Sequence, residues 1–136
     1  MNRVVHFEIH ASDPEKIGTF YSEVFGWEIK EWEMPGVSEE NRYWFVLTAP
    51  EDSKEPGING GMVVRRGELP QEGVPVSSFV CTISVENIDE YLERVKSTGG
   101  TVAVAKMAIP NTAWLAYAKD PEGNTFGLYQ EDSSAL

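Results

Sequence analysis

The sequence is poor in the residues that disulfide frameworks and metal centres require. Among 136 residues there are one cysteine and two histidines. The single cysteine, Cys81, excludes a disulfide within the chain and suits a reducing compartment. Strand alternation around Cys81 predicts that its side chain faces a packed helix, so we expect a buried and inert thiol.

Basic residues are also scarce. The chain has 11 lysines and arginines against 22 aspartates and glutamates, a net charge of −11. The acidic residues are scattered along the sequence and form no block. A surface of this kind repels phosphate backbones and favours solubility, which argues against nucleic-acid binding.

Long apolar runs are absent as well. No stretch approaches the roughly 18 apolar residues of a membrane-spanning helix, and the N-terminus lacks the basic and apolar regions of a signal peptide. We therefore expect no membrane association and a cytoplasmic location. The length suits one domain, residues 1–136.

What the sequence does contain is one pattern that occurs twice. Residues 4–27 are typical of a strand, a helix and a stop, and residues 80–101 repeat the pattern without a gap. His6 falls on Val80 and Asp13 on Asn87, an offset of 74. We interpret this as an internal duplication.

Both copies carry signals for the start and the end of a helix. In the first copy Asp13 is the expected N-cap, Pro14 occupies the first helical position and Gly26 ends the helix. In the second copy Asn87 with Glu90 resembles a capping box, and a glycine pair ends the helix. The matching caps support the duplication.

The remaining segments predict three further strands after each helix. We expect module one at 4–66, a linker at 66–75, module two at 76–130 and a polar tail at 131–136. The predicted later strands are 27–32, 43–47 and 62–65 in module one and 101–107, 114–119 and 125–129 in module two, with strand five at about 76–85. We also match Trp44 with Trp114, at an offset of 70, and Gly61 with Gly127, at an offset of 66.

Two such units predict an α+β fold of two tandem βαβββ modules. Two sheets of this kind can join into an eight-stranded half-barrel with the helices outside and a concave surface inside. A concave surface of that size suits a small molecule. The residues expected to line it are His6, Glu8, His10, Val80, Thr82 and Ser84.

Two motifs resemble a known family. The pattern HxxxxxxDPxxxxxFYxxVFGW begins at His6, and DPEGNTFGLYQ begins at Asp120. Over about residues 4–130 the chain is similar to the vicinal oxygen chelate superfamily, which includes glyoxalase I, bleomycin-resistance proteins, extradiol dioxygenases and fosfomycin-resistance enzymes. The resemblance implies the glyoxalase/bleomycin resistance/dihydroxybiphenyl dioxygenase fold.

The resemblance also implies where a metal would be held. Metal-using members take ligands from the first and fourth strand of each module. In this chain those positions are His6, Gly60 or Gly61, Val80 and Gly127, so only one can bind an ion. Because zinc or nickel needs three or four protein donors, we predict no metal and no cofactor.

The remaining polar and aromatic side chains are candidates for ligand binding. His6 and Glu8 are the candidate catalytic pair for acid–base chemistry, or two buried polar groups that satisfy each other. Thr82, Trp114 and Tyr129 are the other expected ligand-binding residues. Phe45 and Tyr117 are further candidate aromatic walls.

Three functions remain open. The first is a metal-free protein that encloses a small aromatic or amphipathic molecule, as the bleomycin-resistance branch is understood to do. The second is a glyoxalase-like lyase or isomerase, or a dioxygenase-like enzyme, that uses His6 and Glu8. The third is a non-catalytic interaction protein. The resemblance and the exposed strand edges also predict a homodimer.

Overall fold

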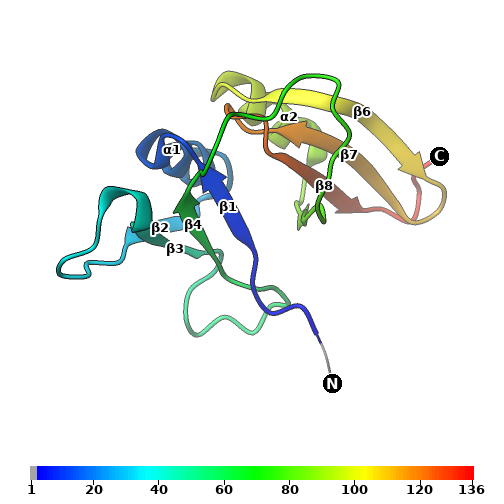
Figure 1. Ribbon diagram of the computed structural model, residues 1–136. Helices are drawn as coiled ribbons and strands as arrows, with labels where there is room; N and C mark the ends of the chain where they lie inside the picture. Colours follow the sequence, from blue (N-terminus) through cyan, green and yellow to red (C-terminus); the bar gives the residue numbers. More distant parts are fainter. Residues whose placement is uncertain (1–2) are drawn as a thin grey trace. The chain divides into compact units, whose positions relative to one another are not determined.

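The computed structural model describes residues 3–136 as two compact units. The first unit ends at Glu68 and the second begins at Leu69. Each unit contains one α-helix and one four-stranded sheet (Figure 1). Within residues 3–136 no helix combines the length and apolar character needed to cross a bilayer.

The first unit is a βαβββ module. Its elements are β1 (Glu8–Ala11), α1 (Pro14–Phe25), β2 (Glu28–Glu31), the 3-10 helix η1 (Glu39–Asn41), β3 (Tyr43–Leu47) and β4 (Gly60–Val64). The strand order is β1-β4-β3-β2. Strand β1 runs parallel to β4, and the other pairs are antiparallel.

The second unit repeats this topology. Its elements are β5 (Thr82–Ser84), α2 (Ile88–Ser97), β6 (Thr101–Ile109), β7 (Ala113–Lys119) and β8 (Thr125–Glu131). The order is β5-β8-β7-β6, again with one parallel pair, β5 with β8. The predicted α+β class with two tandem βαβββ modules is confirmed.

Strand register supports the duplication at the level of single residues. Glu8 pairs with Gly61 in the first unit, and Thr82 pairs with Gly127 in the second. These pairs are related by the two offsets found in the sequence, 74 and 66. The match between the two glycines is therefore confirmed.

The proposed match between the two tryptophans is wrong. Trp44 pairs with Met62 in the first unit. The residue of the second unit that corresponds to Met62 pairs with Ala116, so Ala116 is the counterpart of Trp44. Trp114 pairs instead with Gln130. A coincidence of residue type does not define equivalence, because equivalence in a sheet follows the hydrogen-bonded register.

The helix boundaries follow the predicted caps. The Asp13 side chain accepts a hydrogen bond from the Lys16 amide at 3.1 Å, and Gly26 adopts a left-handed φ of 73°. The Asn87 side chain accepts from the Glu90 amide at 3.2 Å. These local hydrogen bonds satisfy amides that the helix itself leaves unpaired.

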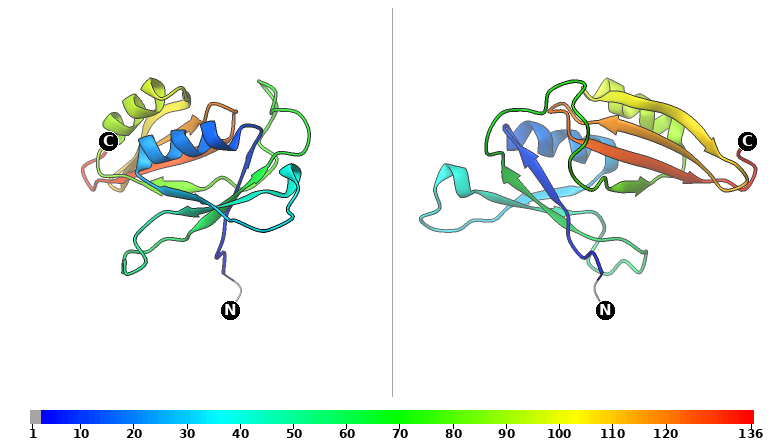
Figure 2. Two further views of the ribbon diagram at one scale, coloured as in Figure 1. Left: turned by 90° about the vertical axis from the view of Figure 1, so that its left-hand side faces the viewer. Right: turned by 45° about the vertical axis from the view of Figure 1, so that its right-hand side comes forward.

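Each helix covers one face of its own sheet (Figure 2). The buried side chains of the first unit are Ile9, Ala11, Ile17, Phe20, Tyr21, Val24, Trp44, Val46 and Met62. Those of the second include Val85, Ile88, Leu92, Val95, Ala113, Ala116, Ala118, Phe126 and Leu128. In each sheet the strand residues that alternate with the core positions (Ile9, Val46 and Met62 in the first, Ala116, Ala118 and Leu128 in the second) lie on the face away from the helix, because successive strand residues point to opposite sides.

The first strand of each module is shorter than the sequence predicts. Strand β5 begins at Thr82, and the preceding Phe79 is fully exposed. Cys81 is exposed as well, so the prediction of a buried thiol is wrong. The sheet ladder between β5 and β8 starts only at Thr82, so alternation before that point does not bury a side chain.

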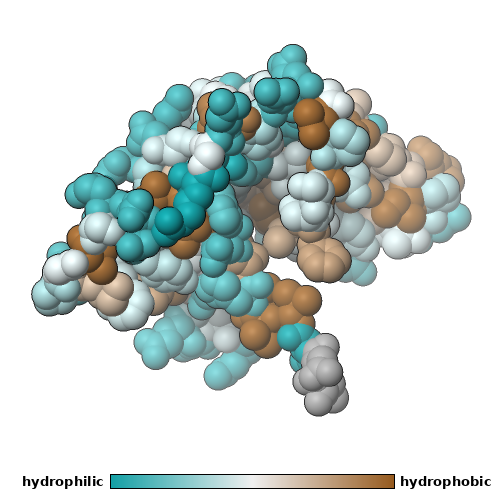
Figure 3. All heavy atoms as spheres, in the orientation of Figure 1, coloured by the Kyte–Doolittle hydropathy of each residue, from teal (hydrophilic) through white to brown (hydrophobic). Residues whose placement is uncertain are grey.

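The same holds at the N-terminus. Strand β1 begins at Glu8, and the preceding Val4 and Val5 are 78% and 75% exposed. Hydrophobic side chains reach the surface beside this end of β1 (Figure 3). His6 lies in this segment and is also exposed. Apolar alternation alone therefore overestimates the extent of both strands.

The motif at residues 120–124 forms the tight turn between β7 and β8. Asp120 is only 3% exposed, and its Oδ1 accepts from the amides of Glu122 at 2.8 Å and Asn124 at 3.0 Å. Its Oδ2 accepts from the Asn124 side chain at 2.7 Å. One carboxylate thus holds the whole turn, and Gly123 supplies the positive φ of 85° that the turn requires.

We expect the substitution Asp120→Ala to lower the free energy of unfolding by about 1–3 kcal/mol, because two amides lose their acceptor in a buried turn. Urea denaturation measures this change. Asp52→Ala is the matched control, since Asp52 is exposed and its loss should cost less than about 0.5 kcal/mol. Equal losses in the two variants would contradict the role assigned to Asp120.

Candidate ligand-binding face

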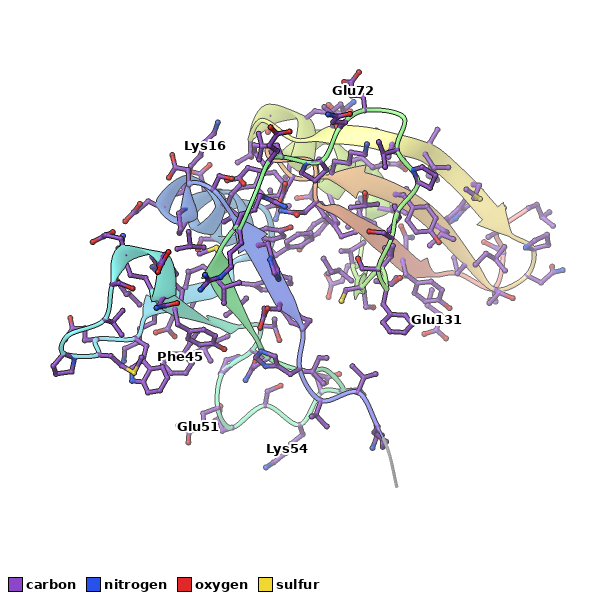
Figure 4. All side chains as sticks on the ribbon, viewed as in Figure 1. Lys16, Phe45, Glu51, Lys54, Glu72 and Glu131 are labelled. Carbon is purple, nitrogen blue, oxygen red and sulfur yellow. The ribbon has the colours of Figure 1, made fainter. Side chains whose placement is uncertain are left out.

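The face of the first sheet that points away from α1 carries the candidate site. Its side chains come from alternate positions of three adjacent strands, with Glu8 and His10 on β1 and Tyr43 and Phe45 on β3. Gly61 of β4 lies between them. Figure 4 shows Phe45 on the side of the sheet opposite the helix. We call this surface the open face of module one.

Glu8 and His10 form an interacting pair on this face. The Nε2 atom of His10 lies 3.0 Å from Oε1 of Glu8, and the two side chains are 50% and 47% exposed. The alternation of the sequence predicts that His6 is the partner of Glu8, as a catalytic pair or as two buried polar groups. Residues two apart in a strand share a face, and because β1 begins at Glu8, the strand neighbour that shares it is His10.

The absence of a side chain at Gly61 makes room for a tyrosine. A Cβ atom added to Gly61 would lie 2.0 Å from the Tyr43 hydroxyl oxygen and 2.4 Å from Cζ. Real Cβ atoms do not approach other atoms so closely, so the Tyr43 ring occupies the space above β4. Any larger residue at this position would displace the ring.

Trp32, Tyr43 and Phe45 form what we call the aromatic cluster. Ring centroids lie 6.1 Å apart for Trp32–Tyr43, 5.8 Å for Trp32–Phe45 and 5.4 Å for Tyr43–Phe45. Two of the pairs are edge-to-face, with interplanar angles of 81° and 80°. Trp32 and Phe45 remain 49% and 38% exposed, so the cluster presents aromatic surface to solvent.

The Tyr43 hydroxyl stays protonated well into the alkaline range. Burial raises the pKa of Tyr43 above its ordinary value, and the negative charge of Glu8 raises this pKa further. The hydroxyl is therefore a hydrogen-bond donor at neutral pH. Sequence reasoning missed Tyr43 and Trp32 as site residues, although the spacing of Tyr43 and Phe45 in one strand already placed them on one face. His10 was expected on this face, but its pairing with Glu8 was not predicted.

The corresponding face of the second sheet has a different chemistry. Thr82, Tyr117 and Tyr129 lie on it, from β5, β7 and β8. A Cβ at Gly127 would lie 2.9 Å from the Thr82 hydroxyl oxygen and 3.4 Å from the Tyr117 ring. Here too a neighbouring strand supplies the hydroxyl that covers the glycine. Val80 precedes β5 and is partly exposed.

Trp114 lies on the other face of the second sheet. It alternates with residues of β7 that face away from α2, and it shares its side with the buried Ala116. Its indole Nε1 donates to Asp132 at 2.9 Å, and the Lys106 ammonium lies 4.5 Å from its ring centroid. Lys106 in turn contacts Asp89 of α2 at 2.7 Å. Trp114 is therefore separated from Thr82 and Tyr129 by the sheet.

The same helix-covered side carries the hydrogen bonds of Asp132. Its pKa is lowered, first by hydrogen bonds from the side chain and amide of Ser134 and then by the one from Trp114. These contacts hold the end of β8 against the tryptophan. We assign Trp114 and Asp132 a structural role.

Comparison with protein families agrees with the duplicated topology. A sequence model of the Glyoxalase/Bleomycin resistance protein/Dioxygenase superfamily matches residues 3–128. The chain belongs to this superfamily. A search among curated proteins finds no match.

Solved structures of superfamily proteins share the fold at low sequence identity. Glyoxalase I from Zea mays has a TM-score of 0.73 and 20% identity, covering 95% of this chain and 44% of the maize chain. Glyoxalase I from Leishmania major, described as trypanothione-dependent, has a TM-score of 0.70 and 19% identity over 96% and 88%. A Frankia sp. EAN1pec protein named for the same superfamily has a TM-score of 0.68 and 18% identity over 97% and 99%. This chain spans less than half of the maize protein, and at these identities the likeness shows the fold alone.

The residues at the superfamily's metal positions do not fit a metal centre. Two of the four are glycines, Gly61 and Gly127, and hydroxyl-bearing side chains of adjacent strands cover both. Val80 has no donor atom in its side chain, and His6 remains as the one ligand-type side chain. Across residues 3–136, no group of three or more histidines, cysteines, aspartates or glutamates is arranged to hold an ion.

We expect Gly61→Ala to lower the free energy of unfolding by about 1–3 kcal/mol, because the new methyl group displaces the Tyr43 ring. Removing the ring first should relieve the clash, so Gly61→Ala should cost less in a Tyr43→Ala background. Thermal and urea denaturation of the four variants in this double-mutant cycle measure the coupling. Gly57→Ala is the control, because a Cβ there meets nothing within 4 Å.

The electrostatic influence of Glu8 on Tyr43 can be tested by titration. Glu8→Gln removes the negative charge that opposes ionisation of the phenol, so we expect the pKa of Tyr43 to fall while staying above its ordinary value because of burial. Site-resolved NMR titration of the tyrosine ring carbons measures the shift. Glu23→Gln, on the exposed side of α1, should leave this pKa unchanged. An unchanged pKa of Tyr43 in the Glu8 variant would show that the charge of Glu8 does not act on the phenol.

Proposed function

We propose that this superfamily member is a metal-free protein that binds a small organic molecule on the open face of module one. The observation that carries the proposal is the Tyr43 ring over Gly61. A position that holds a metal ligand in other members here supports a phenol at the edge of an aromatic cluster. Aromatic surface with a few polar groups at its border is typical of small-molecule sites.

The polar groups of the face can orient a bound ligand through hydrogen bonds. Tyr43 donates a hydrogen bond, Glu8 accepts one, and His10 can do either according to its tautomer. The expected ligand residues His6, Thr82 and Tyr129 remain part of the proposal. His6 lies beside β1, and Thr82 and Tyr129 lie on the equivalent face of module two.

An enzyme is the alternative, and the Glu8–His10 pair favours it. A carboxylate within hydrogen-bond distance of an imidazole can orient the ring, an arrangement used in general acid–base catalysis. A glyoxalase-like lyase or isomerase, or a dioxygenase-like reaction, would use Glu8 with His10 or His6.

Exposed apolar segments before β1 and β5 support the proposal of a homodimer, because exposed apolar surface is typical of protein–protein contacts.

A thermal-shift screen of aromatic metabolites and antibiotics tests the binding function. A ligand of the native state raises the melting temperature by mass action. We expect hits whose shift disappears in Phe45→Ser and persists in Phe79→Ser, a matched control because Phe79 is fully exposed and lies outside the face. Hits whose shift in melting temperature persists in Phe45→Ser would show that the binding site lies elsewhere.

Metal analysis tests the metal-free part of the proposal. Protein purified without chelators should contain much less than one equivalent of zinc, nickel, iron or manganese by elemental analysis. The His6→Ala variant should have the same metal content as the parent protein. Stoichiometric metal that is lost in His6→Ala would overturn the proposal and favour the metal-dependent enzyme.

A further inference from the structure

We propose that the ligand of the open face is an organic cation, an amine, guanidine or quaternary ammonium group attached to an apolar body. This inference rests on the proposed function and names the chemistry of its ligand. Two features of the face carry it: the exposed rings of the aromatic cluster, and the Glu8 carboxylate placed beside them.

The rings supply the first part of a cation site. Aromatic faces carry negative charge density, and ammonium or guanidinium groups bind within about 6 Å of a ring centroid. Trp32, Tyr43 and Phe45 lie at tilted or perpendicular angles to one another, so rings of different orientation meet at one place. Trp32 and Phe45 keep much of their surface exposed, which leaves them accessible to a ligand.

The strand register supplies the second part. Glu8 pairs with Gly61, and Gly61 pairs with Phe45, so the three residues form one row across β1, β4 and β3. The backbones of Glu8 and Phe45 lie two strand spacings apart, a distance of about 10 Å. The residue between them has no side chain, and the Tyr43 ring lies over it. A cation bound on the outer surface of this ring would have the Glu8 carboxylate on one side and Phe45 on the other.

The lysine and arginine nearest the face lie at its margins, and the Glu8 carboxylate also contacts the His10 ring at 3.0 Å. Lys30 pairs with Phe45 from β2, the outermost strand, on the side away from Glu8. The Arg65 guanidinium donates to the His10 carbonyl at 2.7 Å. Glu28 adds a second carboxylate on β2, and the whole chain has a net charge of −11, which raises the local concentration of cations. The charge of the surroundings thus agrees with the charge proposed for the ligand.

Three probes with the same phenylethyl body isolate the effect of charge. These are 2-phenylethylamine, a cation at neutral pH, the neutral 2-phenylethanol and the anion 3-phenylpropionate. We expect the amine to bind about tenfold more tightly than the alcohol, and the acid to bind more weakly than both. NMR titration that follows the indole N–H of Trp32 measures the three affinities.

Substitution of the carboxylate separates charge from shape. Glu8→Gln keeps the size of the side chain, so the affinity for the amine should fall to that for the alcohol, while the alcohol is unaffected. Glu23→Gln is the control for the loss of one negative charge from the same unit, and it should leave all three affinities unchanged. Added salt should weaken the binding of the amine alone, because salt screens the attraction between exposed charges.

The outcomes distinguish this inference from the function on which it rests. Equal affinities for the three probes, all abolished by Phe45→Ser, would overturn the cation inference and leave the binding face intact. Tighter binding of the acid than of the amine would also overturn the cation inference. If the amine binds but neither Glu8→Gln nor Phe45→Ser changes its affinity, the open face is not the site, and both proposals fail.

Discussion

The Tyr43 ring can lie across β4 only because residue 61 has no side chain, and the rest of the candidate site depends on this contact. With the ring in place, its hydroxyl lies over Gly61 and its edge meets Phe45. The same position brings the phenol within the field of Glu8, which contributes to its raised pKa. One glycine thus determines the packing, the hydrogen-bonding capacity and the electrostatics of the face.

The two modules share one backbone topology, but the side chains on their open faces differ. Both have the same strand order and the same parallel pair, and Gly61 and Gly127 occupy equivalent places in them. The side chains that cover the two glycines nevertheless differ, a tyrosine in one module and chiefly a threonine in the other. Backbone hydrogen bonds tolerate such changes on the open face, because side chains there do not contribute to the core beneath the helix.

The sequence predicted the fold well where the signals are local. The N-caps at Asp13 and Asn87 each bond to an amide three residues away, so the motif contains the whole interaction. Strand ends were predicted less well. Alternation extended strand five back to about residue 76, but β5 begins at Thr82, where pairing with β8 begins. The burial of Cys81 was predicted wrongly for the same reason.

By itself, the sequence determined the two modules, their helix boundaries and the glycines at the superfamily's metal positions. The tertiary structure decided which side chains fill the space above those glycines, that Glu8 contacts His10, and that Trp114 lies beneath α2 and away from Thr82. The physical reason is the range of the contacts. Caps and turns close within a few residues, whereas Tyr43 reaches Gly61 only through the register of two strands that the loop at 48–59 separates.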